Sequence, residues 1–271
     1  MKVHRVSLGG KPRRVLNAKP AGNSALAFVI AGSLGAALIF YWRPGVLSIL
    51  VTWGVVIALG IFKLGRQRPD DLGLRGTGVI PGLVYGVLYW LSLQAAVLAA
   101  APWYGGPARL DPQLTTGAWM AFAGPLIDQF IFFASAEEVV YRGFLLPQIY
   151  LRLQERIPKP VALSGSALLG SVFFAVLHIP HRLEEGITGQ QLVFSMLLLV
   201  IAGCVFFGIY LLTGNLLTVI LVHGLSNFPT LLYDAEIPWQ HALVLKYGLA
   251  LGLAIAYAIW LRRHGGRVAH V

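Results

Sequence analysis

The chain has 271 residues, of which 57% are hydrophobic and only 12% charged, whereas soluble domains carry about 25% charged residues. This composition excludes an ordinary soluble globular domain. The formal net charge of +10 does not indicate a nucleic-acid-binding protein, because the basic residues lie between apolar segments and not on one solvated face. The single cysteine, Cys204, excludes an intramolecular disulfide and a two-cysteine metal site.

Apolar segments that are long enough to cross about 30 Å of hydrocarbon recur along the chain. Helices are their expected form, because backbone polar groups in lipid must be paired within the structure and the segments lack the alternation of barrel strands. The sequence therefore predicts an all-α, polytopic transmembrane helix bundle of about eight spans. The segments are residues 24–42, 46–62, 79–101, 116–136, 161–179, 191–212, 215–232 and 242–261.

The distribution of basic residues predicts the orientation of the bundle. Seventeen of the 21 Lys and Arg residues fall in the tails and the even-numbered loops of an eight-span arrangement. The positive-inside rule then places both termini in the cytoplasm. The first apolar segment is longer than the hydrophobic region of a signal peptide, so we expect it to remain as an uncleaved span.

No linker long enough to separate two folded domains interrupts the apolar pattern. We expect a basic cytoplasmic tail at residues 1–23, a single transmembrane domain at residues 24–262 and a short basic C-terminal tail at residues 263–271. The short loops and the compact chain favour a multi-pass protein of a bacterial inner (plasma) membrane.

Two adjacent carboxylates, Glu137 and Glu138, lie at the end of the fourth apolar segment. An ionised carboxylate in hydrocarbon is costly unless it is paired, hydrated or protonated. On a helix Glu138 and Arg142 are i and i+4 neighbours that can form an ion pair, whereas Glu137 points about 100° away. Glu137 is therefore available for a separate role. The alternative is a charge cluster at the membrane surface that merely ends the span.

Two further polar pairs occur at helical spacing. Phe174 and His178 are i and i+4 at the end of the fifth segment, and His223 and Asn227 have the same spacing in the seventh. Taken alone, His178 is typical of an interfacial histidine, and the second pair is typical of a hydrogen bond between helices. Together with Glu137, however, three segments supply a carboxylate, two imidazoles and an amide, which are groups that hydrolysis uses.

Three motifs thus follow one another within apolar segments. They are Glu137-Glu138-x-x-x-Arg142, Phe174-x-x-x-His178 and His223-x-x-x-Asn227. This series resembles the CPBP family of intramembrane endopeptidases, which is named for CAAX proteases and bacteriocin-processing proteins. The resemblance covers residues 117–229, and the first three segments and the eighth share only their hydrophobicity with that family.

The resemblance implies peptide-bond hydrolysis at the membrane, with Glu137 as the general base. It also implies that His178 assists Glu137, and that His223 and Asn227 hold the water or the oxyanion. An amide such as that of Asn227 can donate to an oxyanion without bringing a charge into the membrane. The residues implied to support this site are Glu138, Arg142 and Phe174.

A zinc site is the alternative to a glutamate mechanism, because Glu137, His178 and His223 also form a ligand set of hydrolytic zinc. Against zinc, the sequence has no His-Glu-x-x-His pair that would fix two ligands on one helix. We therefore expect a metal-independent mechanism without a cofactor.

The expected partners are membrane lipid and a membrane-associated peptide or protein substrate. Lipidated and leader-bearing chains are among the candidate substrates, and no nucleic acid is expected as a partner.

Two other functions fit a polar site in a membrane bundle. One is a non-catalytic scaffold or immunity protein of the same fold, and the other is a small transporter that uses the acids as a proton relay. A scaffold has no need of Glu137 once Glu138 and Arg142 are paired. A transporter is disfavoured because the acids are confined to one segment and no interrupted helices suggest an inverted repeat.

The depth of Glu137 predicts a shifted fourth helix. We expect it to start late, at Asp128 or Phe130, and to continue through Arg142 towards Leu151, with residues 116–127 as an outer or re-entrant piece. Polar residues that follow the fifth segment are expected to form a solvated connection without a functional role: His181, Arg182, Glu184 and Glu185.

Overall fold

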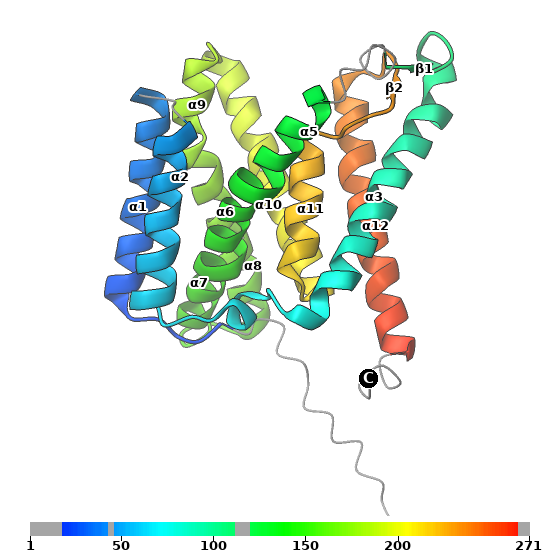
Figure 1. Ribbon diagram of the computed structural model, residues 1–271. Helices are drawn as coiled ribbons and strands as arrows, with labels where there is room; N and C mark the ends of the chain where they lie inside the picture. Colours follow the sequence, from blue (N-terminus) through cyan, green and yellow to red (C-terminus); the bar gives the residue numbers. More distant parts are fainter. Residues whose placement is uncertain (1–17, 43–45, 112–119, 265–271) are drawn as a thin grey trace, which may run out of the picture.

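The chain folds into a bundle of helices packed side by side (Figure 1). The computed structural model describes residues 18–42, 46–111 and 120–264. Several predictions lie outside the described residues: most of the N-terminal tail (1–17), the loop at Arg43, the start of the fourth segment at residue 116 and the end of the C-terminal tail (265–271).

Helical stretches in the described part of the chain follow the eight predicted apolar segments. The first three are α1 (Asn23–Trp42), α2 (Val46–Val55) with η1 (Val56–Leu64), and α3 (Val79–Ala100). The fourth consists of α5 (Met120–Ile127), η5 (Asp128–Phe133), α6 (Ala134–Glu138), η6 (Val139–Leu145) and α7 (Leu146–Leu153). The last four are α8 (Lys159–Leu177), α10 (Gly189–Thr213), α11 (Leu216–Asn227) and α12 (Trp239–His264).

Short elements connect these stretches. They are η2 (Pro69–Leu72), η3 (Gly76–Gly78), η4 (Ala101–Tyr104), α9 (Ile179–Glu184), and two strands, β1 (Arg109–Leu110) and β2 (Tyr233–Asp234), which pair antiparallel.

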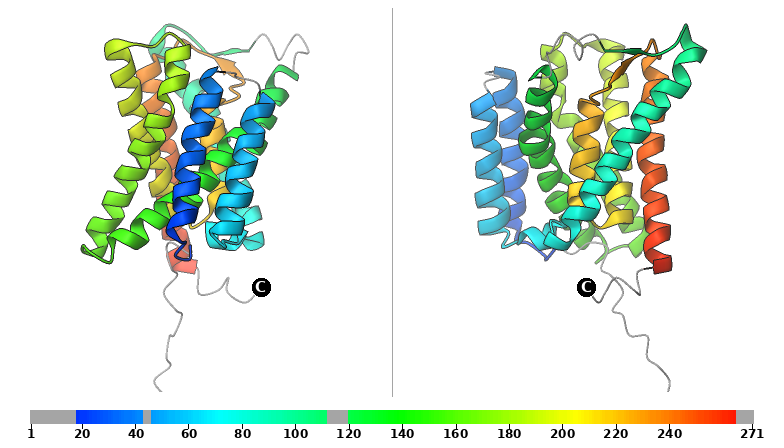
Figure 2. Two further views of the ribbon diagram at one scale, coloured as in Figure 1. Left: turned by 90° about the vertical axis from the view of Figure 1, so that its left-hand side faces the viewer. Right: turned by 45° about the vertical axis from the view of Figure 1, so that its right-hand side comes forward.

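Within the described residues, four helical regions are long and apolar enough to cross a membrane: Gly76–Tyr104, Lys159–Glu184, Gly189–Thr213 and Trp239–Trp260. Three apolar helices in the same part of the chain are shorter: Asn23–Ile39, Leu50–Leu64 and Leu216–Asn227. The turned views show the helices running side by side between the same two ends of the bundle (Figure 2). These features identify a polytopic helical membrane protein, while the arrangement of eight spans remains a prediction.

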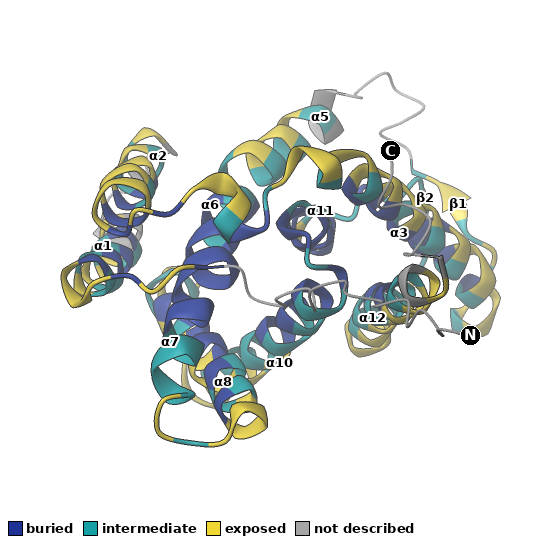
Figure 3. Ribbon diagram, turned by 90° about the horizontal axis from the view of Figure 1, so that it is seen from below, coloured by how far each residue is buried: buried dark blue, intermediate teal, exposed yellow. Residues whose placement is uncertain are grey.

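The outward faces of the helices suit contact with lipid. Large apolar side chains such as Leu47, Ile80 and Val244 are exposed by 75%, 73% and 71%. The buried residues instead gather in the middle of the bundle, where α11 is enclosed by its neighbours (Figure 3). All seven residues of η6 are buried as well. The polar residues that matter for function lie in this interior.

The bundle has two different ends. At one end the Leu216 N–H donates to the Gly73 carbonyl over 3.1 Å, so the segment around η2 covers the turn between α10 and α11. At the other end β1 pairs with β2, and the Tyr104 hydroxyl lies 2.7 Å from Nδ1 of His241. We call these the η2 end and the strand end. α1 begins, and α12 ends, at the η2 end (Figure 1).

The fourth helical stretch corrects one prediction. It is continuous from α5 to α7, so residues 120–127 are its first turns and not a separate re-entrant piece. The predicted continuation through Arg142 towards Leu151 is confirmed. Two parts, η5 and η6, are π-helical and lie close to Pro125 in α5 and Pro147 in α7. Since proline lacks an N–H and crowds the preceding turn, wider turns accommodate it without ending the helix.

α11 is shorter than the seventh predicted segment. It begins where the Asn215 side chain accepts from the Leu217 N–H over 3.1 Å, which caps the helix. It ends at Asn227, whereas the predicted segment extended to residue 232. Phe228 precedes Pro229 and leaves the helical region, with φ −134° and ψ 86°. A residue before proline is disfavoured in the α conformation, so the helix ends here.

Gln148 connects the start of the described chain to α7. Its side-chain oxygen accepts from the Ala21 N–H over 2.8 Å, and its nitrogen donates to the Lys19 carbonyl over 2.7 Å. The side chain is fully buried, and its bond to the Ala21 N–H is buried as well. The segment before α1 is thereby fixed at the η2 end.

We expect Gln148→Ala to destabilise the protein by about 1 to 3 kcal/mol, because the buried Ala21 N–H loses its partner. The Lys19 carbonyl keeps its hydrogen bond from Gln67. Gln154→Ala, at a partly exposed glutamine at the end of α7, is the matched control and should change little. Thermal unfolding in detergent measures both. Equal melting temperatures for the two variants would contradict this role of Gln148.

Candidate active site

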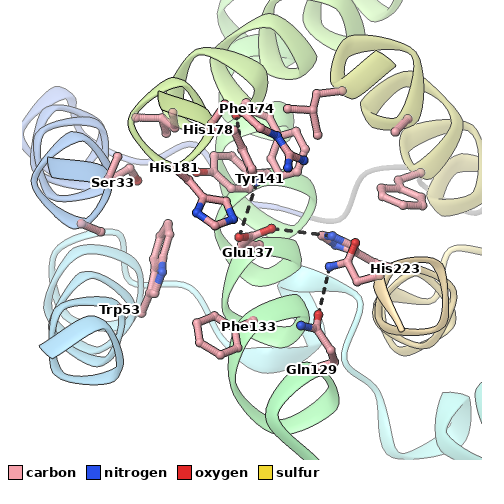
Figure 4. A pocket seen from close by; sticks show the side chains of 18 of the residues that line it. Ser33, Trp53, Gln129, Phe133, Glu137, Tyr141, Phe174, His178, His181 and His223 are labelled. Carbon is pink, nitrogen blue, oxygen red and sulfur yellow. Dashed lines mark hydrogen bonds and ion pairs between the residues drawn. The ribbon is translucent and has the colours of Figure 1, made fainter. Parts of the chain in front are cut away.

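One cavity of about 460 Å³ is lined by all four residues predicted to be catalytic (Figure 4). Glu137 projects from α6, His178 forms the C-cap of α8, and His223 and Asn227 come from α11. Glu137 occupies the middle of the group, with imidazoles on two sides (Figure 4). The structure thus brings together three polar pairs that are far apart in the sequence.

A buried charge network forms the base of this site. Nη1 of Arg142 donates to Oε1 of Glu138 over 2.9 Å, so the predicted i, i+4 ion pair is confirmed. Nδ1 of His223 lies 2.7 Å from the same oxygen. An ionised carboxylate only accepts hydrogen bonds, so this nitrogen carries the proton and donates it. The contact of His223 with Glu138 was not predicted from the sequence.

Arg142 is surrounded by aromatic rings and one backbone carbonyl. Its guanidinium carbon lies 4.7 Å from the ring centre of Phe174 and 5.3 Å from that of Phe206. Its Nη2 donates to the Gly203 carbonyl of α10 over 3.5 Å. Gly203 also lets α8 approach α10, because a Cβ there would lie 2.7 Å from the Ser171 hydroxyl oxygen of α8. Close packing of α8 and α10 therefore encloses the guanidinium.

Phe174 orients His178. Its backbone carbonyl accepts from Nδ1 of His178 over 2.8 Å, because a carbonyl cannot donate. Its ring lies 4.4 Å from the His178 ring, centre to centre, and 6.1 Å from that of His223. Nε2 of His178 is left facing Glu137, 3.9 Å from Oε1. The motif spacing of four residues thus fixes both the proton position and the direction of this imidazole.

Glu137 lies between two nitrogen atoms of the same kind. Nε2 of His178 is 3.9 Å from one carboxylate oxygen and Nε2 of His223 is 3.7 Å from the other. In each neutral ring the proton is on Nδ1, so both Nε2 atoms are acceptors that face an acceptor. Such an arrangement is stable only with a shared proton or a water between the groups. Glu137 is 18% exposed, so the cavity can provide that water.

Asn227 is held by a residue that sequence reasoning missed. Its Nδ2 donates to Oε1 of Gln129 over 2.9 Å (Figure 4). Gln129 lies in η5, two turns before Glu137 on the same helical stretch, and lines the same cavity. α11 approaches η5 closely at Gly224, where a Cβ would lie 2.5 Å from the Phe130 ring. The π-helical turn that carries Gln129 is not visible in the apolar pattern.

His181 and Arg182 also line the cavity, although the sequence analysis gave them no role. They lie on α9, and His181 points toward the group around Glu137 (Figure 4). Arg182 is paired with Glu185 over 2.6 Å. Their position one helical turn after His178 is the sequence signal that could have placed them here. Glu184 and Glu185 do not line the cavity.

The zinc alternative rests on Glu137, His178 and His223. Within residues 18–42, 46–111 and 120–264, no group of three or more His, Cys, Asp or Glu side chains has the arrangement of a metal site. Nδ1 of His223 is engaged by Glu138, so only its Nε2 faces Glu137.

These features define a class: a helical membrane protein with a carboxylate, two histidines and an amide around a water-accessible cavity. Residues 117–229 match the family model of type II CAAX prenyl endopeptidase Rce1-like proteins. This region therefore belongs to the CAAX protease family of intramembrane proteases, which confirms the resemblance drawn from the three motifs, and the protein is an integral membrane protein. Comparisons with curated proteins and with solved structures give no match.

We expect Arg142→Ala to destabilise the fold by about 3 to 5 kcal/mol, because it leaves the Glu138 carboxylate buried without its partner. Glu137→Ala should unfold at nearly the same temperature as the unchanged protein, since Glu137 belongs to no such ion pair with Arg142. Arg156→Ala, at an exposed arginine, controls for the loss of a positive charge. Equal stability of Arg142→Ala and Glu137→Ala in detergent would contradict this division of roles.

Proposed function

We propose that this protein is an intramembrane endopeptidase that hydrolyses a peptide bond with a water activated by Glu137. The observation that carries the proposal is the position of the Glu137 carboxylate, 3.9 Å and 3.7 Å from the Nε2 atoms of His178 and His223 inside a cavity. A water bridging these groups can lose a proton to the carboxylate or to an imidazole. The family of residues 117–229 supports the same reaction class.

The proposed reaction follows from the direction of each group. The water oxygen attacks the carbonyl carbon of the substrate while Glu137 takes its proton. The carbonyl oxygen becomes negative, and an N–H of Asn227 donates to it without adding a charge. When the carbon–nitrogen bond breaks, the proton held by Glu137 passes to the leaving amine. His178 and His223 can accept a proton from Glu137 or from the water at Nε2 and return it in a later step.

Gln129 limits how Asn227 can act. One N–H of Asn227 is used in the hydrogen bond to Gln129, so the other remains for the substrate oxygen. This bond holds the amide plane in one orientation, and a preorganised donor contributes more than one that must rotate during the reaction. We therefore assign Gln129 the role of a positioning residue.

The proposed substrate is a membrane-associated peptide or protein. The cavity lies among helices whose outer faces are apolar, so a substrate with a lipid or helical anchor can approach within the membrane plane. Lipidated and leader-bearing chains both satisfy this condition.

We further propose an eight-span arrangement in a bacterial inner membrane with both termini in the cytoplasm. The alternation of the helical stretches between the two ends of the bundle supports this topology.

We propose that the reaction needs no metal and no other cofactor. The support is that each imidazole is already oriented by a protein partner: Nδ1 of His178 by the Phe174 carbonyl and Nδ1 of His223 by Glu138. Proton transfer among Glu137 and the two Nε2 atoms then suffices to activate water. If zinc is bound, Glu137, His178 and His223 are the residues that would hold it.

We expect Glu137→Gln to lower the cleavage rate by about 10²-fold or more, because the amide keeps the shape of the side chain but cannot take a proton. The substrate is found by comparing the termini of membrane proteins in cells with the unchanged protein and with this variant. Glu184→Gln, at an exposed residue outside the cavity, is the control. Absence of any Glu137-dependent terminus would contradict the peptidase assignment.

Chelators should leave this activity unchanged, since no metal takes part in the proposed steps. Metal analysis of the purified protein accompanies the cleavage assay. Stoichiometric zinc that is lost in both His178→Ala and His223→Ala, together with silencing by chelator and recovery on adding zinc, would overturn the metal-independent mechanism and leave the peptidase assignment standing.

We expect Gln129→Ala to lower kcat about tenfold with little change in KM, because one hydrogen bond that orients Asn227 is lost. Asp128→Ala, at the exposed neighbour on the same turn, is the control. Combining Gln129→Ala with Asn227→Ala should cost no more than Asn227→Ala alone, since both act through one donor. If the two losses multiply, Gln129 does not act through Asn227.

A further inference from the structure

We infer that the cavity opens toward the non-cytoplasmic side of the membrane, so that the protein cleaves peptide bonds which its substrates present at that side. This inference rests on the proposed peptidase function, and it assigns the substrate class that the function leaves open. Two independent observations carry it: the positions of the buried layer and of the polar cavity residues along the bundle, and the distribution of basic residues between the two ends.

Buried residues close the cavity toward the η2 end. Every residue from Glu138 to Gln148 is buried, which includes all of η6 and the first turn of α7. The charged pair of Glu138 and Arg142 fills the centre of this layer and is sealed by the rings of Phe174 and Phe206. Among the residues that line the cavity, Tyr141 is the one that belongs to this layer.

Polar side chains instead lead from Glu137 toward the strand end. Asn227 is exposed and ends α11, and Gln129 lies in η5, nearer the strand end than Glu137. His181 and Arg182 belong to α9, which lies at the strand end (Figure 1). His178 itself lies about 28 Å along α8 from Lys159 at about 1.5 Å per residue. Water and substrate therefore reach Glu137 from the strand end.

Basic residues gather at the opposite end. Those in the described segments at the η2 end are Lys19, Lys63, Arg66, Arg68, Arg75, Arg152, Arg156, Lys159, Arg262 and Arg263. Those nearer the strand end, within the described residues, are Arg109, Arg182 and Lys246. Arg142 belongs to neither group, because it is buried in the bundle and cannot act as a topology signal. The positive-inside rule places the η2 end in the cytoplasm.

The two observations together orient the site. If the η2 end is cytoplasmic, then the strand end, and with it the mouth of the cavity, faces away from the cytoplasm. The substrate class is then an exported peptide or protein that is held by a lipid or helical anchor and carries its scissile bond just outside the non-cytoplasmic face. A prenylated tail in the cytoplasm would have to cross the membrane to reach Glu137.

Cysteine labelling of the full chain tests the orientation. Cys204 is the single cysteine, so Cys204→Ala gives a cysteine-free background. Glu184→Cys and Glu155→Cys are then matched variants, because both replace an exposed glutamate, in α9 at the strand end and in the connection between α7 and α8 at the η2 end. A membrane-impermeant maleimide is applied to intact bacterial cells and, separately, after lysis.

We expect the Glu184→Cys protein to be labelled in intact cells and the Glu155→Cys protein only after lysis. The reverse pattern would overturn the inference, and so would equal labelling of both in intact cells, which indicates mixed orientation. A reporter enzyme fused after residue 264, active only in the cytoplasm, gives a second reading that does not depend on cysteine reactivity. It should be active if the η2 end is cytoplasmic and inactive otherwise.

The termini that depend on Glu137 test the substrate class. We expect the sites lost in Glu137→Gln cells to lie on the non-cytoplasmic side, near an anchor of the substrate. Sites confined to cytoplasmic tails would overturn the inference while leaving the peptidase assignment intact. Absence of any such site would remove the proposed function, whereas labelling would still report the orientation, so the two failures are distinguishable.

Discussion

Burial of a charged pair at the centre of an apolar bundle is the constraint on which the rest of this structure depends. Glu138 is 0% and Arg142 2% exposed, and a buried ion pair is tolerated only when further hydrogen bonds satisfy it. His223 provides one from α11 and the Gly203 carbonyl provides another from α10. Three helical stretches must therefore meet at fixed distances. The same placement of His223 brings its second nitrogen to Glu137, so the candidate site depends on the packing that gives the pair these two hydrogen bonds.

Two neighbouring carboxylates have opposite environments because a helix rotates about 100° per residue. Glu138 faces the packed interior and is engaged on Oε1 by both Arg142 and His223. Glu137 faces the cavity, and the Nε2 atoms of His178 and His223 lie 3.9 Å and 3.7 Å from its carboxylate oxygens. One carboxylate is thus fixed by its neighbours and the other keeps access to water. A base that must exchange protons in each turnover needs the second environment, whereas a structural anchor needs the first.

The apolar segments and the pairs at helical spacing could be predicted from the sequence, because both depend on local periodicity. The ion pair of Glu138 and Arg142 is confirmed for that reason. The bond between His223 and Glu138 joins residues 85 positions apart and depends on how helices pack, which local pattern does not encode. Gln129 was missed because π-helical turns leave no mark in an apolar segment. The end of α11 was placed too late, although Pro229 signalled it.

The shortness of α11 has a consequence for the peptide substrate of the proposed reaction. Its 12 residues span about 18 Å, whereas the hydrocarbon layer is about 30 Å thick. An extended peptide exposes N–H and C=O groups that lipid cannot pair. Beyond Asn227 the protein offers a non-helical segment in place of another helical turn. A substrate can therefore unwind beside this segment with its backbone solvated while its anchor stays in hydrocarbon.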